Sequence, residues 1–474
     1  MRESEKLLGN TAVLGVASMI AKGISFLFMP FLTSYLSPGE LGVAEVVANT
    51  ALILLPFASF YAPETLFRFL ASEGEGKTVV TASVTLAALG VLLFLLLFPL
   101  TFLVPFLRGY RLALLFYVLA ALLHSFFSHW LRARGNYRAY AVQQIATTAL
   151  TVLLQAVLLG VFELGTLGYL FAIAAGDTLV GGVLLFLLRP WRYVKLGSAQ
   201  RRAVGRMARY ALPLMPTAAV FLVTSLSNRY FLLYYHGEAA TGIYAAAGRI
   251  PALFTLLFSV FLEAWHYSAV SFREGRRARI FARTYQLLLP LSGMLCGGFM
   301  LVAPFLVRLL LHDDYEGAAM PLLFLLAGAF CSALSSFLGS AYHVKLRSGE
   351  CLFTALLGAA FSVTLNFLLI PRFFLLGAAL ASFLSYLVML LLRLYRVGKL
   401  FCVKLSGGST VRVVLLLLFA ASSLAVHVWW GALLSLALIA ISFWRELLEA
   451  MRVLLSFLIK FKKRQKKAGD IDNS

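Results

Sequence analysis

The chain of 474 residues is 61% hydrophobic and only 13% charged, whereas soluble globular domains carry about 25% charged residues. This composition excludes an ordinary soluble protein and predicts that lipid surrounds most of the chain. A net charge of +21 would suggest nucleic acid as the partner of a soluble protein, so the position of the basic residues decides its meaning.

Apolar stretches of roughly 20 residues recur along the whole sequence and predict about fourteen transmembrane helices. The stretches are continuous rather than alternating, which excludes a barrel and predicts an all-α fold. The first stretch follows MRESEKLLGN without a small-residue cleavage site, so we interpret it as a retained span and not as a signal peptide. The predicted spans cover residues 8–34, 40–67, 79–106, 112–131, 140–162, 167–188, 210–235, 240–269, 284–310, 318–343, 352–371, 375–392, 411–427 and 429–444.

Basic residues indicate how the spans are oriented. Most of the 41 Lys and Arg residues fall in the two terminal segments and in alternate loops, whereas the other loops hold only Arg108, Arg111 and Arg372. Lys and Arg are retained on the cytoplasmic side of membranes. We therefore predict a multi-pass protein of the cytoplasmic membrane with both termini in the cytoplasm.

The two halves of the chain resemble each other across a basic connector. YLSPGELGVAEVVANTALILLPF parallels YYHGEAATGIYAAAGRIPALFTLLF at an offset of 200, which places Gly42 on Gly242 and Asn49 on Arg249. Repeated six-helix units are typical of secondary transporters, whose substrate site lies between the repeats. The predicted organisation is a six-helix bundle at 1–190, a cytoplasmic amphipathic linker at 191–209, a second six-helix bundle at 210–398, two additional transmembrane helices at 399–446 and a basic amphipathic cytoplasmic tail at 447–474.

Three basic residues lie deep in predicted spans. Lys22 is near the middle of the first span, Arg229 about nine Å from the outer end of 210–235, and Arg249 about fifteen Å inside the next span. A buried charge costs about 2.5 to 3.5 kcal/mol, so these residues should face a cavity or a partner. Arg offers a planar fork to phosphate and Lys a point charge, so a cationic cavity suits a diphosphate. Pairing with carboxylates or snorkelling is the alternative.

Acidic residues in the spans are candidates for coupling or gating. Asp177 lies near the middle of 167–188 and is either a proton or sodium site or the partner of a buried Arg. Glu45 lies only five residues into its span, which favours a solvated or capping role over coupling. Glu64 and Glu263 lie near the predicted inner ends of their spans, where pairing with loop arginines is favoured over binding sugar or gating.

Two polar residues and several missing motifs complete the predicted site. Asn49 and Asn228 are polar candidates for the cavity. The cysteines have neither CxxC spacing nor a His at ligand distance, so no metal is predicted. No P-loop is present, and the short outer loops lack a carboxylate set for acid and base work, so we predict no enzyme and count this against a membrane-embedded glycosyltransferase.

Three stretches resemble one transporter family. NTAVLGVASMIAKGISFLFMPFLTSYLSPGELGVAEVV resembles the opening of the polysaccharide transporter (Wzx-type) family within the multidrug/oligosaccharidyl-lipid/polysaccharide (MOP) exporter superfamily. NRYFLLYYHGEAATGIYAAAGRIP is similar to the family's D-R-F-F-L…G-I-Y…K-I-P, with Asn228 in place of Asp, and NFLLIPRFFLLGAALASFLSY to N-x-x-L-I-P…G-A-A. Ser34 and Leu41 also depart from the pattern. The matching residues are Pro30, Thr33, Tyr35, Leu36, Ser37, Pro38, Gly42, Asn366, Leu369, Ile370, Pro371, Gly377, Ala378, Ala379, Ala381 and Ser382.

The resemblance implies two pseudo-symmetric six-helix bundles in a V, alternating access and a cargo of undecaprenyl diphosphate-linked glycan. It implies that Lys22, Arg229 and Arg249 match cavity positions, while the loss of Asp at position 228 leaves ion coupling there open. The expected partners are the lipid-linked glycan, the bilayer, a polysaccharide polymerase and glycosyltransferases, with no nucleic acid and no cofactor. The expected driving force that resets the carrier is an exchange of protons or sodium or the membrane potential, and the sequence does not choose among them.

Two other members of the same superfamily are alternatives. A lipid II flippase would share the fourteen helices and the cationic cavity and would differ only in the sugar. A cation-coupled multidrug antiporter should have a more acidic cavity, so the deep arginines count against it.

Overall fold

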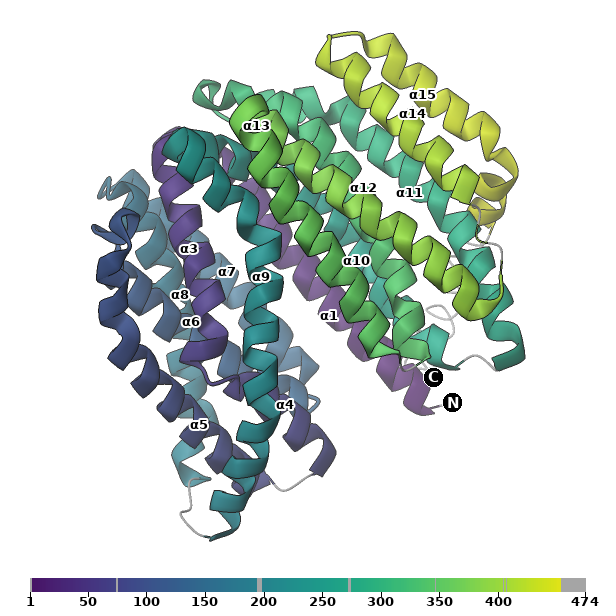
Figure 1. The fold of residues 1–474 in the computed structure, drawn as a ribbon. Helices are drawn as coiled ribbons and strands as arrows, with labels where there is room; N and C mark the ends of the chain where they lie inside the picture. Colours follow the sequence, from purple (N-terminus) through teal and green to yellow (C-terminus); the bar gives the residue numbers. More distant parts are fainter. Residues whose placement is uncertain are drawn as a thin grey trace, which may run out of the picture. The chain divides into compact units, whose positions relative to one another are not determined.

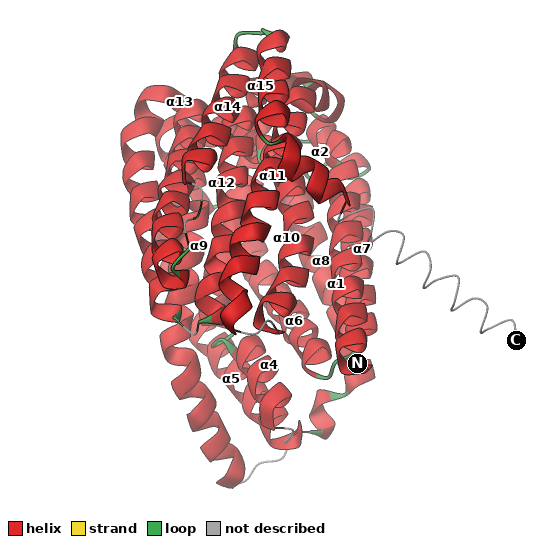
Figure 2. Cartoon of the chain, turned by 90° about the vertical axis from the view of Figure 1, so that its right-hand side faces the viewer, coloured by secondary structure: helices red, strands yellow, loops and turns green. Residues whose placement is uncertain are grey.

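The computed structural model describes the backbone of residues 2–73, 76–193, 198–271, 274–345, 347–403, 405 and 407–452. The side chains of 2–14, 71–73, 198–200, 217, 219–225, 263–264, 266–271, 274–277, 343 and 348 are outside this description. Helices and loops make up all of it, without a strand in these ranges (Figure 2). The all-α prediction is confirmed.

The described part of the chain contains a short helix at Trp444–Arg452 and, before it, fifteen labelled α-helices (Figure 1). They are α1 (Arg2–Leu27), α2 (Met29–Tyr35), α3 (Pro38–Ala58), α4 (Ala62–Glu73), α5 (Gly76–Leu97), α6 (Arg111–Ala133), α7 (Tyr137–Gly160), α8 (Gly165–Leu188), α9 (Ser198–Ala247), α10 (Arg249–Ser271), α11 (Glu274–Leu310), α12 (Ala319–Val344), α13 (Ser348–Phe401), α14 (Gly407–Ala425) and α15 (Trp429–Ser442). Short 3-10 helices follow α5, α8 and α11.

Eleven described helical stretches are long and apolar enough to span a membrane, or twelve if the bent pair at the end of the described chain is one span. Two of these stretches, Leu226–Leu262 and Gly349–Phe401, contain a residue with left-handed backbone angles, Gly237 (φ 81°) and Phe374 (φ 55°). Within α13 the chain folds back, because Arg393 of the second limb bonds to Thr354 of the first. Counting each limb as a crossing accommodates the fourteen predicted spans.

The predicted second span, 40–67, is interrupted in the structure. α3 ends at Ala58, and Phe60 and Tyr61 take left-handed angles (φ 49° and 54°) before α4 begins. Gly90 of α5 lies so close that a Cβ there would overlap the backbone of Phe60. The helix therefore turns where a neighbouring helix approaches its backbone, a contact that hydropathy does not reveal. The predicted span 240–269 is also divided, between the end of α9 and α10.

Contacts group the chain into two compact units that differ from the predicted bundles. The first unit holds residues 1–249, 307–318 and 362–378, and the second 250–306, 319–361 and 379–474. In the first unit α6, α7 and α8 pack together, α3 packs on α6, α8 and α9, and α1 packs on α7. Residues 198–209 of the predicted linker also belong to the first unit. They begin α9, and Met207 is buried there in a cluster with Phe127 and Trp130. The division into bundles stays a prediction.

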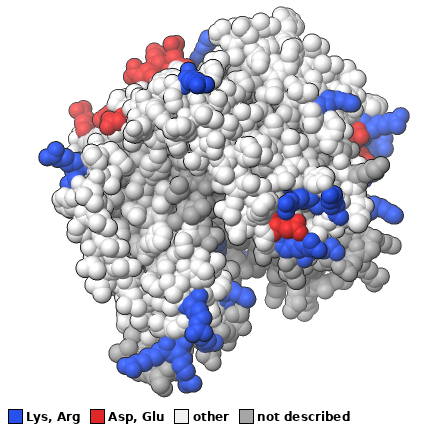
Figure 3. Space-filling model, viewed as in Figure 1, with Lys and Arg blue, Asp and Glu red and all other residues white. Residues whose placement is uncertain are grey.

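The second unit has an aromatic core. Trp265 of α10 packs on Phe337 of α12 with ring centroids 4.9 Å apart, and Phe281 of α11 packs on both Phe337 and Phe401. α14 packs on α12 and α15. On the face drawn in Figure 3, charged side chains lie near helix ends and the surface between them is uncharged, as expected for helices in lipid. Most of the predicted tail, residues 453–474, lies outside the described chain.

Candidate functional site

Two glycines bring α3 against the part of α9 that follows the break at Gly237. A Cβ on Gly42 would overlap the carbonyl oxygen of Glu238, and a Cβ on Gly242 would overlap that of Pro38. The contact is reciprocal at the offset of 200 found in the sequence. Close backbone approach therefore explains the paired glycines. It also places the aligned glycines of the two repeated segments face to face within the first unit.

A cluster of four side chains follows from this contact, and we call it the arginine cluster: Glu45, Tyr169, Arg229 and Arg249. Arg249 donates to the carboxylate of Glu45 and to the Tyr169 hydroxyl, 3.2 Å away. Tyr169 in turn donates to Glu45 over 3.3 Å, and a guanidinium nitrogen of Arg229 lies 3.9 Å from the second carboxylate oxygen. Two guanidinium groups share one carboxylate, so the cluster keeps one net positive charge.

The arginine cluster is deep but still reachable. The exposed fractions of the side chains are 11% for Glu45, 22% for Arg229 and 35% for Arg249. Two buried donors near it, Nε of Arg229 and Nδ2 of Asn49, have no hydrogen-bond partner among the described residues. Asn49 lies one turn beyond Glu45 on α3 and on the same face. Unpaired buried donors are costly, and an anion entering the cluster would supply the acceptors they lack.

The structure corrects the favoured interpretation of Glu45. The residue is 8% exposed and paired with arginines, so it is neither solvated nor a cap. The cap of α3 comes instead from Ser37, whose side chain accepts from the Glu40 amide while Glu40 accepts from the Ser37 amide. The sequence did not indicate this pairing, because Glu45 lies in the first repeat and both arginines lie in the second, far away along the chain.

Lys22 does not join the cluster through any described contact. Its side chain is exposed on α1, the helix that packs on α7. Its place in a cationic cavity therefore stays a prediction.

Asn228 lies in a network of neutral side chains. Its Nδ2 donates to the Tyr244 hydroxyl over 2.7 Å and to the carbonyl of Ala378 over 3.2 Å. Its Oδ1 accepts from Asn366 Nδ2 over 2.8 Å, and Asn366 also donates to Ser227. Two of the stretches that carry the family resemblance thus meet here. Asn366 is fully buried, so hydrogen bonds to protein groups, and not to water, hold its amide in place.

Asp177 pairs with a residue that the sequence analysis did not select. Its carboxylate lies 3.2 Å from Nδ1 of His124 on α6, and the two side chains are 13% and 18% exposed. The predicted partner had been a buried Arg. A single His in an apolar span carries no local pattern, so only the packing of α6 on α8 reveals the pair.

The remaining acidic candidates lie elsewhere. Glu64 starts α4, and its buried Oε2 has no hydrogen-bond partner in the described chain. Burial raises the pKa of the Glu64 carboxyl, and the positive charge of Arg132 partly opposes this. Arg132 itself lies over the rings of Phe67 and Tyr140. The side chain of Glu263 is outside the described residues.

The second unit contains a buried arginine that the sequence analysis assigned to a cytoplasmic loop. Arg393 is 6% exposed and donates to Thr354 over 3.1 Å and to the carbonyl of Ser335 over 2.7 Å. Gly339 makes room for its guanidinium group, since a Cβ there would lie 2.8 Å from it. The signal was present in the sequence, because Arg393 stands inside the apolar run LVMLLLRLYRV.

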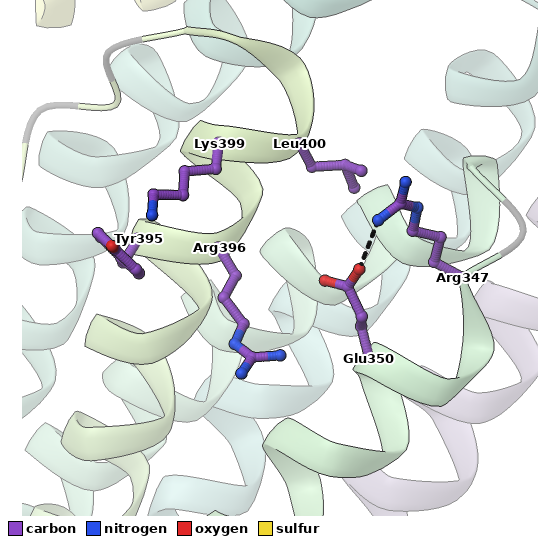
Figure 4. A pocket seen from close by; sticks show the side chains of 6 residues that line it. All are labelled: Arg347, Glu350, Tyr395, Arg396, Lys399 and Leu400. Carbon is purple, nitrogen blue, oxygen red and sulfur yellow. Dashed lines mark hydrogen bonds and ion pairs between the residues drawn. The ribbon is translucent and has the colours of Figure 1, made fainter.

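A basic pocket opens between the two limbs of α13 (Figure 4). It has a volume of about 500 Å³. Arg347 pairs with Glu350 over 2.8 Å, which leaves Arg396 and Lys399 as the other cations of the wall. The lining residues are Arg347, Glu350, Tyr395, Arg396, Lys399 and Leu400.

The fold is similar to solved structures of membrane transporters. Lipid II flippase MurJ in an inward closed conformation matches with a TM-score of 0.68 at 14% identity, over 92% of this chain and 100% of that chain. A mutant of the Vibrio cholerae MATE transporter VcmN matches with a TM-score of 0.61 at 13% identity, over 84% of this chain and 97% of that chain. A MOP superfamily transporter from Pyrococcus furiosus matches with a TM-score of 0.58 at 15% identity, over 82% and 96%.

These likenesses define the class of protein: a multi-pass, all-helical membrane protein with the fold of MOP-superfamily transporters. Residues 7–266 match the family described as polysaccharide biosynthesis protein, and because this is more than half of the sequence, the chain belongs to that family. The resemblance seen in the sequence is thereby confirmed. No curated protein matches the sequence.

Proposed function

We propose that this protein flips a polyprenyl-diphosphate-linked oligosaccharide across the cytoplasmic membrane by alternating access, for cell-surface polysaccharide biosynthesis. The observation that carries the proposal is the arginine cluster, in which two guanidinium groups share one carboxylate and nearby donors are unpaired. A diphosphate supplies several anionic oxygens and suits the planar, bidentate geometry of Arg. The polyprenyl tail stays in lipid while the headgroup crosses.

Glu45 gives the site a means of release. In the empty site the carboxylate is bound by Arg249 and lies near Arg229. An entering diphosphate competes with Glu45 for both guanidinium groups, so its net binding energy is smaller than that of two free arginines. A carrier must bind its cargo weakly enough to let it go, and this competition keeps the affinity moderate.

The family supports the proposed cargo class and setting. A chain of the polysaccharide biosynthesis family would receive its lipid-linked glycan from glycosyltransferases and deliver it to a polymerase. It would act as a carrier and not as an enzyme, in the cytoplasmic membrane with both termini in the cytoplasm, as the basic loops indicate. Protons or sodium would be the coupling ion.

A second candidate is a lipid II flippase. The fold similarity to a structure titled lipid II flippase MurJ favours it, and the arginine cluster would serve either cargo because both carry a diphosphate. The two candidates differ only in the sugar.

Reconstituted liposomes test the proposal. The purified protein is offered a fluorescent oligosaccharide on undecaprenyl diphosphate, the same sugar on undecaprenyl monophosphate, and lipid II, and transfer between leaflets is followed by quenching. We expect fast transfer of the diphosphate-linked oligosaccharide and slow transfer of the monophosphate. Preference for lipid II would select the second candidate, and equal rates for mono- and diphosphate would contradict the role of the arginine cluster.

A further inference from the structure

Two carboxylates in described spans have largely buried side chains, Glu45 and Asp177, and their partners differ in kind. Glu45 faces two guanidinium groups, which are permanently positive. Asp177 faces the imidazole of His124, whose charge depends on a proton. Position 228, where the family pattern has Asp, holds a neutral Asn bound into a neutral network. Asp177 is therefore the deep acid whose charge is free to change.

The geometry of the pair suits a single proton. Asp177 and His124 lie near the middle of α8 and α6 respectively, 3.2 Å apart. Gln144 of α7 lies 3.2 Å from the other ring nitrogen, Nε2. When the Gln144 amide nitrogen donates to Nε2, the ring proton sits on Nδ1 and points at Asp177. With only this ring proton and an ionised carboxylate, the pair carries one negative charge. One further proton makes the pair neutral, and Gln144 can then turn its amide oxygen toward Nε2 to accept a hydrogen bond.

The low-dielectric surroundings give this proton its effect. Without it the pair carries one negative charge inside the bilayer, and with it none, so protonation changes the charge that moves with the carrier when it returns empty. Sodium is a poorer fit, because hard cations take oxygen ligands and here an imidazole nitrogen occupies the near side of the carboxylate.

The groups that face the pair are mostly neutral. Among the described residues no Lys or Arg contacts Asp177 or His124, and α7 contributes only amides and a hydroxyl. The titratable or charged groups in the surroundings are Tyr117 and His129 of α6, and beyond them Arg132 of α6, Glu45 of α3, Tyr169 of α8 and Arg249. The uncharged contacts from α7 are Gln143, Gln144 and Thr147.

A physical link joins the pair to the arginine cluster. α8 carries Asp177 as well as Tyr169, eight residues apart, or about 12 Å along the helix axis. A charge that appears or disappears at Asp177 therefore acts on the helix that holds part of the diphosphate site.

From these observations we propose that His124 and Asp177 form the proton-binding site that couples this carrier to the proton gradient. This inference rests on the proposed function. One proton binds on the outer side, crosses with the pair neutral while the site is empty of lipid, and leaves on the inner side. Each cycle exchanges one proton moving inward for one lipid-linked glycan moving outward.

The test separates coupling from transport. Liposomes with wild-type protein and fluorescent undecaprenyl diphosphate-linked oligosaccharide are given a gradient of one pH unit, and the ratio of lipid between leaflets is measured at steady state. One-proton coupling shifts this ratio by about tenfold. We expect Asp177→Asn and His124→Gln to abolish the shift while exchange of labelled for unlabelled lipid without a gradient continues. Glu163→Gln, which removes an exposed acid from a loop, should behave as wild type.

Each other outcome has a fixed meaning. A full shift in Asp177→Asn and His124→Gln, or a shift driven by sodium instead of protons, overturns the proton site and leaves the flippase proposal standing. If wild-type protein moves no lipid-linked glycan, the flippase proposal fails, and proton uptake by solubilised protein then decides the site. Between about pH 8 and about pH 5, wild type should take up one proton more than Asp177→Asn, and equal uptake overturns the inference.

Discussion

Replacement of Arg249 by methionine, which keeps the apolar stem and removes the charge, should stop transport. Arg249 supplies a charge-assisted hydrogen bond to an incoming diphosphate, worth about 1.5 to 3 kcal/mol, so headgroup affinity should fall about ten- to a hundredfold. Binding of undecaprenyl diphosphate to the detergent-solubilised variant measures the first effect, and the leaflet-transfer assay measures the second.

The same substitution also affects stability, and a second variant separates the two effects. Without Arg249, Glu45 retains the Tyr169 hydroxyl at 3.3 Å and only one guanidinium group, that of Arg229, at 3.9 Å. Loss of one partner of a buried pair costs about 3 to 5 kcal/mol, and the 35% exposure of Arg249 places the expected cost at the lower end. Arg249→Met combined with Glu45→Gln should recover thermal stability but not transport. Normal transport by either variant would refute the reasoning.

Three further predictions concern the same unit. Glu45→Gln removes the competitor of the diphosphate, so binding should tighten while leaflet transfer slows; unchanged affinity would argue against competition. Gly242→Ala forces a methyl group into the backbone of α3 and should lower stability by about 1 to 3 kcal/mol, measured by thermal unfolding in detergent. Gly298→Ala, whose added methyl group meets nothing within 4 Å, should not lower stability. Equal melting temperatures of the two variants would refute the close approach. Asn366→Leu removes the hydrogen bond that Asn366 donates to the amide oxygen of Asn228 over 2.8 Å and should cost about 1 to 3 kcal/mol, a loss that an Asn228→Leu second substitution should reduce rather than double.

Much of the fold could be predicted from the sequence, because lipid allows few solutions. Helices must satisfy their own backbone, so the apolar runs were sufficient to predict an all-helical chain with many membrane-spanning helices. The interruption at Phe60 and Tyr61 was missed, since it depends on the approach of Gly90 from another helix. The reversal at Gly237 fell between predicted spans, where a glycine signals a turn.

The candidate site was predicted in part. Depth alone selected Arg229, Arg249 and Asp177, because a charge in the bilayer is expensive wherever it stands. The depth of a charged residue in its span does not identify the residue that pairs with it. Glu45 pairs across the repeat and Asp177 pairs with His124, and such pairings depend on which faces of distant helices meet. Arg393 was assigned to a loop because charge counting treats every Arg near a span end alike.

The central claim is that the arginine cluster holds the diphosphate of a lipid-linked glycan. The most direct test is a structure of the wild-type protein in lipid nanodiscs with undecaprenyl diphosphate-linked oligosaccharide bound. The account predicts diphosphate oxygens within hydrogen-bond distance of both Arg229 and Arg249, with Glu45 displaced from Arg249. A headgroup bound elsewhere, with the pair between Glu45 and Arg249 intact, would contradict it.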